Sequence, residues 1–231
     1  MITLAQLRDY VIYTKHDPYS PALFLLKWIE EAGELGEEWL LNRRMEGDGI
    51  KGTLEEELWD VLCYLVHVAL ATGVDLPRAM VLREEHNAAR FQRPGIRAFF
   101  GPRAEHPEEL GLDEIQQYVR AVPHPQAKPE ADYIHLIKEI GLASQAYIRS
   151  SEHGMAAYRL AAAGGIDGTL EARLWDAMFY LLRMANAAGA DMEQCAIIKE
   201  KYNARRFGRM GIDEFIACQG IPKDRSSRDG Q

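Results

Sequence analysis

Hydrophobic residues recur mostly every three or four positions along the chain, the spacing of amphipathic helices, and no segment shows the alternation typical of a strand. Ala, Leu and Glu are abundant. The pattern predicts an all-α protein. Helices are expected over residues 4–14, 22–45, 54–72, 75–91, 112–121, 132–150, 155–163, 170–188 and 191–206.

The second set of predicted helices repeats the first. GIKGTLEEELWDVLCYL at 49–65 matches GIDGTLEARLWDAMFYL at 165–181, and NAARF at 87–91 matches NARRF at 203–207. Both matches have the same shift, from 52 to 168 and from 87 to 203. An earlier match, from 3–11 to 111–119, has a slightly smaller shift. Such a duplication can be purely structural, because stacking two small helical units extends their core.

Segments rich in proline lie between the two copies, at 101–110 and 123–131. Proline lacks the amide that a helix interior needs, so these segments are expected to be connectors. The tail is polar and has few apolar anchors, so it is expected to be loosely ordered. The predicted organisation is a repeat over 1–100, a linker over 101–111, a second repeat over 112–221 and a tail over 222–231.

Composition excludes several classes of partner. The formal net charge of −8 argues against a nucleic-acid polymer, since such binding needs a basic face. Cys63, Cys195 and Cys218 have no CxxC spacing, which fits a reducing compartment better than a disulfide framework or a zinc site. The N-terminus lacks the features of an export signal, and no stretch approaches the roughly 20 apolar residues of a membrane span. We therefore expect a cytoplasmic protein with no membrane partner.

Two pairs of carboxylates have a spacing that suits metal binding. Glu31 and Glu34 lie about 60° apart on one helix face, and Glu57 and Asp60 have the same relation on the next main helix. If these helices pack side by side, the four carboxylates converge, and like charges so close together need compensation. A hard divalent cation such as Mg²⁺ or Mn²⁺ provides it and can also bind substrate phosphates. For the first pair alone, a solvated acidic face is the alternative.

EEAGE at 30–34, ELWD at 57–60 and NAARF at 87–91 resemble the MazG-like nucleoside triphosphate pyrophosphohydrolases, an all-α superfamily that includes dCTP pyrophosphatases and dimeric dUTPases. The shared signature is EExxE followed, after a gap, by ExxD. The resemblance is close over about 4–96 and weaker over 112–212. It implies Mg²⁺ as the usual metal, with Mn²⁺ possible, and cleavage of a nucleoside triphosphate to a monophosphate and pyrophosphate. The metal ligands it implies are Glu31, Glu34, Glu57 and Asp60.

Other side chains near these motifs are candidates for the reaction. Glu30 is next to a predicted ligand but points elsewhere, and it is predicted to be the base for the attacking water. Asn87 and Arg90 share a face of a later helix and are predicted to hold phosphate or sugar oxygens, with an ion pair at the helix end as the alternative for Arg90. Lys27 is either a further phosphate contact or a partner for Glu31.

Three further residues near the motifs have a structural interpretation. Thr53 and Glu56 have the spacing of a capping box, which predicts that Glu56 is structural. Trp28 could stack on a nucleotide base, although a Trp at helical spacing more often belongs to the core.

The second copy lacks most of the predicted metal-binding charge. Its aligned residues are Glu139, Leu142, Arg173 and Asp176, which have a charge of −1 where the first copy has −4. Lys138 in place of Glu30 makes this copy neutral. We expect the two cations to take the place of metals, so that the second copy binds no metal and is inactive.

In the superfamily that the chain resembles, the working unit is a pair of such bundles. The two copies are therefore predicted to form a pseudo-dimer within one chain, with the second copy as scaffold and a wall of one active pocket. Asn203 and Arg206 either contribute to that pocket or are remnants. Alternatives to the enzyme are a nucleotide-binding regulatory module without hydrolysis and a purely structural repeat. Apolar helix faces also leave a homo-oligomer open.

Overall fold

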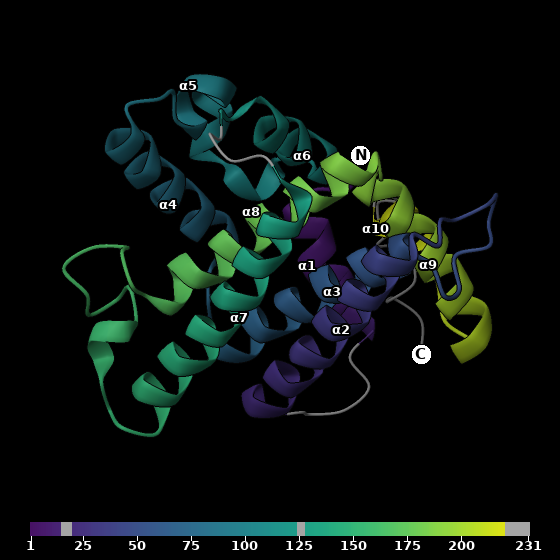
Figure 1. The fold of residues 1–231 in the computed structure, drawn as a ribbon, viewed down its shortest axis with the longest axis horizontal. Coiled ribbons are helices and arrows are strands. Elements are labelled where there is room, and N and C mark those ends of the chain that lie inside the picture. Colours follow the sequence, from purple (N-terminus) through teal and green to yellow (C-terminus); the bar gives the residue numbers. More distant parts are fainter. Residues whose placement is uncertain (15–19, 124–127, 220–231) are drawn as a thin grey trace, which may run out of the picture.

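The computed structural model describes residues 1–14, 20–123 and 128–219. These residues form α-helices joined by short 3₁₀ segments, and their β pairing is limited to isolated bridges (Figure 1). The predicted all-α class is confirmed. The helices are α1 (Leu4–Thr14), α2 (Pro21–Leu41), α3 (Leu54–Thr72), α4 (Leu76–Phe91), α5 (Ile96–Phe100), α6 (Leu112–Ala121), α7 (Pro129–Ser151), α8 (Leu170–Ala188), α9 (Met192–Phe207) and α10 (Ile212–Gln219).

The helices α3 and α8 begin and end with the same local signals. The hydroxyl of Thr53 accepts a hydrogen bond from the first turn of α3, and that of Thr169 does so for α8. Gly73 and Gly189 end the two helices, each with φ of 67°, a left-handed conformation that glycine adopts without steric cost. These signals explain why both helices have the bounds predicted from the sequence.

Three predicted helices differ from the structure by three residues or more, and α5 and α10 have no predicted counterpart. α7 begins at Pro129 rather than at residue 132, so the end of the predicted connector over 123–131 is helical. α2 ends at Leu41 rather than at residue 45, because Asn42 adopts a left-handed conformation and its N–H caps the Glu38 carbonyl. The predicted helix over 155–163 is wrong, since only a 3₁₀ turn, Ala156–Tyr158, forms there. The N–H of Leu160 instead donates to the carboxylate of Glu171, at 3.0 Å. This tertiary contact overrides the local helix preference of an alanine-rich segment.

The predicted linker contains two ordered 3₁₀ turns, Gly101–Glu105 and Pro107–Glu109. Leu110, at the end of the linker, is fully buried. The predicted tail, 222–231, lies outside the described residues. The domain boundaries therefore stay a prediction.

Helices of the two halves share one core. α2 packs along α3, and α7 packs along α8, while α4 contacts α8 and α9 contacts α3. Figure 1 shows α4 and α9 toward opposite ends of the long axis, with the two helix pairs between them. The buried side chains of both halves, including Trp28, Trp59 and Trp175, form one contiguous cluster. The last long helix of each half therefore packs against the other half. We refer to this arrangement as the exchange of α4 and α9.

Glu84 of α4 and Glu200 of α9 anchor this exchange with matching hydrogen bonds. Buried Glu84 accepts hydrogen bonds from Trp175 Nε1 at 3.0 Å and from the Tyr118 hydroxyl at 2.5 Å, and it pairs with Arg93 at 2.7 Å. The donors to Glu200 are Trp59 Nε1 at 3.0 Å, the Tyr10 hydroxyl at 2.7 Å and Arg209 at 2.8 Å. Each donor to Glu200 is the aligned counterpart of a donor to Glu84, which supports the predicted pseudo-dimer.

Within the described ranges, no single helix is both long and apolar enough to cross a membrane. α3 and α4 meet those criteria only as a pair, and the pair is bent by 102°.

Candidate metal centre

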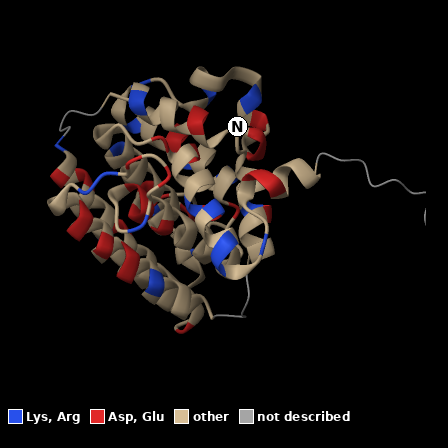
Figure 2. Ribbon diagram, turned by 90° about the vertical axis from the view of Figure 1, so that its right-hand side faces the viewer, with Lys and Arg blue, Asp and Glu red and all other residues tan. Residues whose placement is uncertain are grey.

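Three of the four predicted metal ligands converge between α2 and α3. Glu31, Glu57 and Asp60 each place one carboxylate oxygen within 4.8 Å of the other two. Glu57 and Asp60 share a face of α3, and α2 packs along that helix, so the predicted side-by-side packing brings Glu31 to the same place. Glu34 is exposed and lies outside this group, one turn further along α2. Acidic residues recur along the outer helices of the molecule (Figure 2). The charge of Glu34 nevertheless contributes to raising the pKa of Glu31 and of Glu57.

Burial and mutual repulsion make the ionised cluster unfavourable without a cation. Burial, with the nearby Asp60 charge second, raises the pKa of Glu57 to about 8 and that of Glu31 to about 7. Burial also raises the pKa of Asp60 to about 6, although the ammonium of Lys199 opposes this shift. Oε2 of Glu57 is buried and has no hydrogen-bond partner among the residues that the structure describes. This acceptor is suited to a cation.

The donor set fits a hard divalent cation. Carboxylate oxygens are the ligands that Mg²⁺ and Mn²⁺ prefer, and opposite ligands of Mg²⁺ stand about 4.2 Å apart, at 2.1 Å each from the ion. The three oxygens lie within 4.8 Å of one another, so modest side-chain movements would bring them around one ion. Glu31, Glu57 and Asp60 are therefore the residues that could hold a metal.

Lys199 of α9 enters this centre from the second half of the chain. Its Nζ lies 2.6 Å from Oδ2 of Asp60 and also pairs with Glu56, and its side chain is 8% exposed. Glu56 additionally accepts the N–H of Gly52, at 2.5 Å, so its predicted structural role at the start of α3 is supported. Sequence reasoning missed Lys199. The sequence feature that could have indicated Lys199 is its position four residues before Asn203, on the same helix face.

Glu30 and Lys27 lie on the exposed side of α2. Their side chains pair with each other at 2.6 Å, and each is about half exposed. The partner of Lys27 is thus Glu30 rather than Glu31. Trp28 is completely buried in the core, so it is not available to stack on a base.

Asn87 and Arg90 lie with the second copy of the motif. They line a pocket of about 660 Å³ that also contains Glu139 and Asp176, the counterparts of Glu31 and Asp60. The exchange of α4 and α9 explains this position, because each helix lies beside the site of the other repeat. The role of Asn87 and Arg90 as phosphate contacts stays a prediction, and their location assigns it to this second pocket.

Cations neutralise the remaining carboxylates of the second copy. Glu139 pairs with Lys138 and with Arg173, each at 3.0 Å, as expected from the sequence. Asp176 pairs with Arg83 of α4 at 2.7 Å, a contact from the first half that the sequence did not indicate. These pairs support the prediction that the second copy needs no metal.

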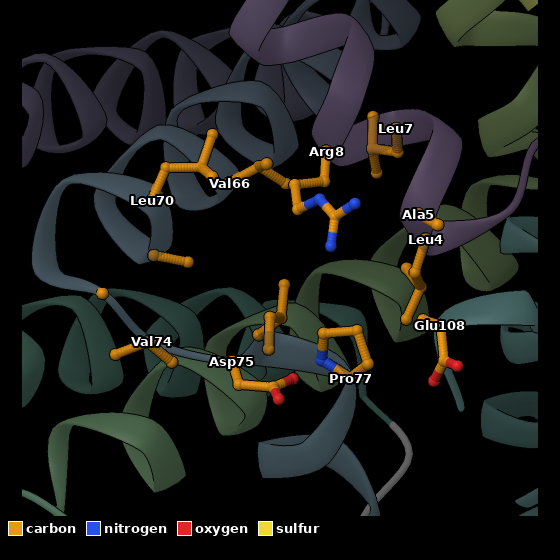
Figure 3. A pocket seen from close by; sticks show the side chains of 13 residues that line it. Leu4, Ala5, Leu7, Arg8, Val66, Leu70, Val74, Asp75, Pro77 and Glu108 are labelled. Atoms are coloured by element: carbon orange, nitrogen blue, oxygen red, sulfur yellow. The ribbon is translucent and has the colours of Figure 1, made fainter. Parts of the chain in front are cut away.

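A separate cavity of about 430 Å³ lies between α1 and the junction of α3 with α4 (Figure 3). Its walls are largely apolar and include Leu7, Val66 and Leu70, with Arg8 and Asp75 among the charged residues. None of the predicted metal ligands lines this cavity.

Comparison with known proteins gives one similarity. Over 79 residues, the chain is 35% identical to dCTP pyrophosphatase 1 of Rattus norvegicus. The match covers 32% of this chain and 46% of the relative, so the chain spans about half the length of the curated protein that it matches. No family model matches the chain, and no solved structure matches it. The chain is thus similar to a nucleotide pyrophosphatase over about a third of its length.

Proposed function

We propose that this protein is a Mg²⁺-dependent nucleoside triphosphate pyrophosphohydrolase with one active site, in the N-terminal repeat. The observation that carries the proposal is the convergence of Glu31, Glu57 and Asp60, with a buried oxygen of Glu57 that has no partner within the described residues. The similarity to dCTP pyrophosphatase 1 supports the same class of reaction and favours a deoxynucleoside triphosphate as substrate.

In this proposal Glu31, Glu57 and Asp60 hold the metal, and Glu34 joins them from the adjacent turn of α2. A bound divalent cation would neutralise phosphate charge and favour the ionisation of a water molecule. Without such neutralisation, the carboxylates would repel a triphosphate. Mn²⁺ is an alternative to Mg²⁺ for the same oxygen donors.

Lys199 positions one of the ligands. Its ammonium lowers the pKa of Asp60 against the effect of burial, which favours the ionised ligand. Further along α9, Asn203 and Arg206 lie four and seven residues after Lys199, on the same helix face. Arg206 is exposed, with its guanidinium carbon 5.1 Å from the ring centroid of Phe207. We assign Asn203 and Arg206 as contacts to the phosphates or sugar at the first site.

Glu30 is assigned as the base that accepts a proton from the attacking water. It is adjacent to Glu31, and its exposed side chain pairs with Lys27. A base must come within hydrogen-bond reach of the water that it deprotonates, so this assignment requires the pair to open when substrate binds.

Product analysis tests the proposed function. The full chain is incubated with each common deoxynucleoside and ribonucleoside triphosphate and Mg²⁺, and the products are separated by ion-exchange chromatography. Equal amounts of monophosphate and pyrophosphate are expected, with at least a 100-fold slower reaction in Glu57→Gln. Release of orthophosphate with a diphosphate would contradict the reaction class. Metal-dependent binding without turnover would instead favour a regulatory nucleotide-binding module.

A further inference from the structure

The pocket of about 660 Å³ in the second repeat occupies the position that corresponds to the candidate metal centre. Its walls come from α4 of the first half and from α7 and α8 of the second half. Its volume is in the range of small-molecule sites, roughly 300–1,000 Å³. The exchange of α4 and α9 thus places a helix of the other repeat beside each motif, and within the described residues the carboxylate cluster forms at the first motif.

The second pocket is more positive than its counterpart. Its charged lining residues are Arg83, Arg90, Arg93, Lys138 and Arg173 against Glu139, Asp167 and Asp176. The aligned residues of the first site are Lys199, Arg206, Arg209 and Lys51 against Glu30, Glu31, Glu57 and Asp60. The second pocket thus has five cationic and three acidic lining residues, whereas the aligned positions of the first site have four of each. The second pocket is therefore more positive by two charges. One divalent cation would add the same charge to the first site.

The positive charge is only partly neutralised within the pocket. Lys138 and Arg173 share a single carboxylate, that of Glu139. Arg90 is exposed, with its guanidinium carbon 5.4 Å from the ring centroid of Phe91, and no described residue forms an ion pair with it. Donors on Arg90 and Lys138 are therefore accessible to an anion. Guanidinium and ammonium groups at such positions suit phosphate oxygens.

Aromatic side chains line the same pocket. Phe91 of α4 is 62% exposed, and Phe179 and Tyr180 of α8 also line the pocket. Phe179 occupies the position of Cys63 in the first repeat, so this pocket has an additional ring. Aromatic faces next to cationic groups suit a nucleobase next to its phosphates.

We propose that this second pocket binds the phosphate chain of a nucleotide without a divalent cation. Arg90 and Lys138 contact the phosphates, and the aromatic wall accommodates the base. Arg83 is already paired with Asp167 and Asp176. The positive charge that a metal would supply at the first site therefore comes here from Arg90 and from Lys138 and Arg173, which share the carboxylate of Glu139. Binding here does not depend on hydrolysis at the first site, and it gives the second repeat a function beyond that of a scaffold.

Calorimetric titration of the full chain in excess EDTA tests this proposal. The ligands are inorganic pyrophosphate, each of the four deoxynucleoside triphosphates and the uncharged parent deoxynucleosides. Saturable binding is expected for at least one triphosphate and not for its parent deoxynucleoside. Arg90→Gln and Lys138→Gln should each weaken this binding about ten-fold, the effect of one charge-assisted hydrogen bond. Both side chains are exposed, and unchanged thermal melting would show that the variants are folded.

Arg206→Gln is the matched control, since Arg206 is the counterpart of Arg90 at the first site. It should leave binding in EDTA unchanged. If pyrophosphate binds as tightly as a triphosphate, the phosphate chain is sufficient, whereas tighter binding of triphosphates assigns a contribution to the nucleoside. No saturable binding at millimolar concentrations, or equal affinity in the native protein, Arg90→Gln and Lys138→Gln, would overturn the proposal. Binding in EDTA without turnover under Mg²⁺ would retain it while rejecting the proposed hydrolase.

Discussion

Nζ of Lys199 lies 2.6 Å from Oδ2 of Asp60, although 139 positions separate the two residues. The lysine belongs to α9 and the aspartate to α3, so the candidate metal centre contains residues from both halves of the chain. The aligned pair in the other site, Arg83 and Asp176, has a separation of 2.7 Å. Each half therefore places a cation against the aspartate that ends the four-residue carboxylate pattern of the other half. The second half is thus part of the first site, in addition to packing against it.

Replacing Lys199 with Met is expected to lower the free energy of unfolding by about 3 kcal/mol in EDTA, because it removes the cation from a largely buried ion pair. Asp60 then lacks its ammonium partner, and Glu56 retains only Lys51 among its ion-pair partners in the described residues. Urea denaturation followed by circular dichroism measures the change. The control is Lys201→Met, because Lys201 is 49% exposed and stands 3.6 Å from Asp48. Equal losses in the two variants would argue against a structural role for the Lys199 pair.

The stability of the metal-free protein is expected to fall as pH rises from about 5 to 8. The pKa of Glu57 is raised to about 8 and that of Glu31 to about 7, both from an ordinary value of 4.5. Between these values the folded protein binds more protons than the unfolded chain, so stability decreases with pH. Thermal melting in EDTA over this range measures the effect.

Two additions to that experiment identify its cause. Glu57→Gln should reduce the pH dependence, since the amide does not titrate. Mg²⁺ should raise the melting temperature more at pH 8 than at pH 6, because its ligands must be deprotonated. A metal-free melting temperature that is constant over this range would contradict the predicted repulsion in the cluster.

Glu84→Ala and Glu200→Ala are expected to destabilise the whole chain by similar amounts, about 3 kcal/mol each. Each substitution removes a buried carboxylate and leaves an indole N–H, a hydroxyl and a guanidinium without their acceptor. Chemical denaturation should show one transition for both halves, shifted to lower denaturant. Glu105→Ala is the control, since that side chain is 66% exposed. Separate transitions for the two halves would contradict a shared core.

Glu30→Gln is expected to lower kcat at least about 100-fold with little change in KM, the signature of a lost general base. Steady-state turnover of the preferred triphosphate provides both constants. Glu37→Gln, a change at another exposed glutamate of α2, should leave both constants unchanged. Native kcat in Glu30→Gln would remove this residue from the mechanism without affecting the assigned metal ligands.

Local sequence signals were sufficient for much of the fold and for the core of the site. The bounds of α3 and α8 follow from a threonine cap and a terminal glycine, which act through adjacent backbone groups. The convergence of Glu31 with Glu57 and Asp60 follows from helical spacing and from the packing of neighbouring helices.

The exchange of α4 and α9 could not be predicted from such local signals. Periodicity shows that Lys199 and Asn203 share a helix face, but it does not show which helix that face meets. From the sequence, Asn87 and Arg90 are expected beside the acidic motif of their own repeat, whereas they line the pocket of the other repeat. The missing helix over 155–163 has a similar cause, since Glu171 acts on Leu160 through a contact that local composition does not encode.

The most direct test of the central claim is turnover by the native chain and by Glu34→Leu/Glu57→Arg, which places the residues of the second copy in the first. Both proteins are compared with Mg²⁺ and with excess EDTA, after circular dichroism has shown that both are folded. Monophosphate and pyrophosphate are expected from the native protein with Mg²⁺ alone, and neither product above background from the variant. Native turnover by the variant, or turnover of the native protein in EDTA, would contradict a metal-dependent active site in the N-terminal repeat.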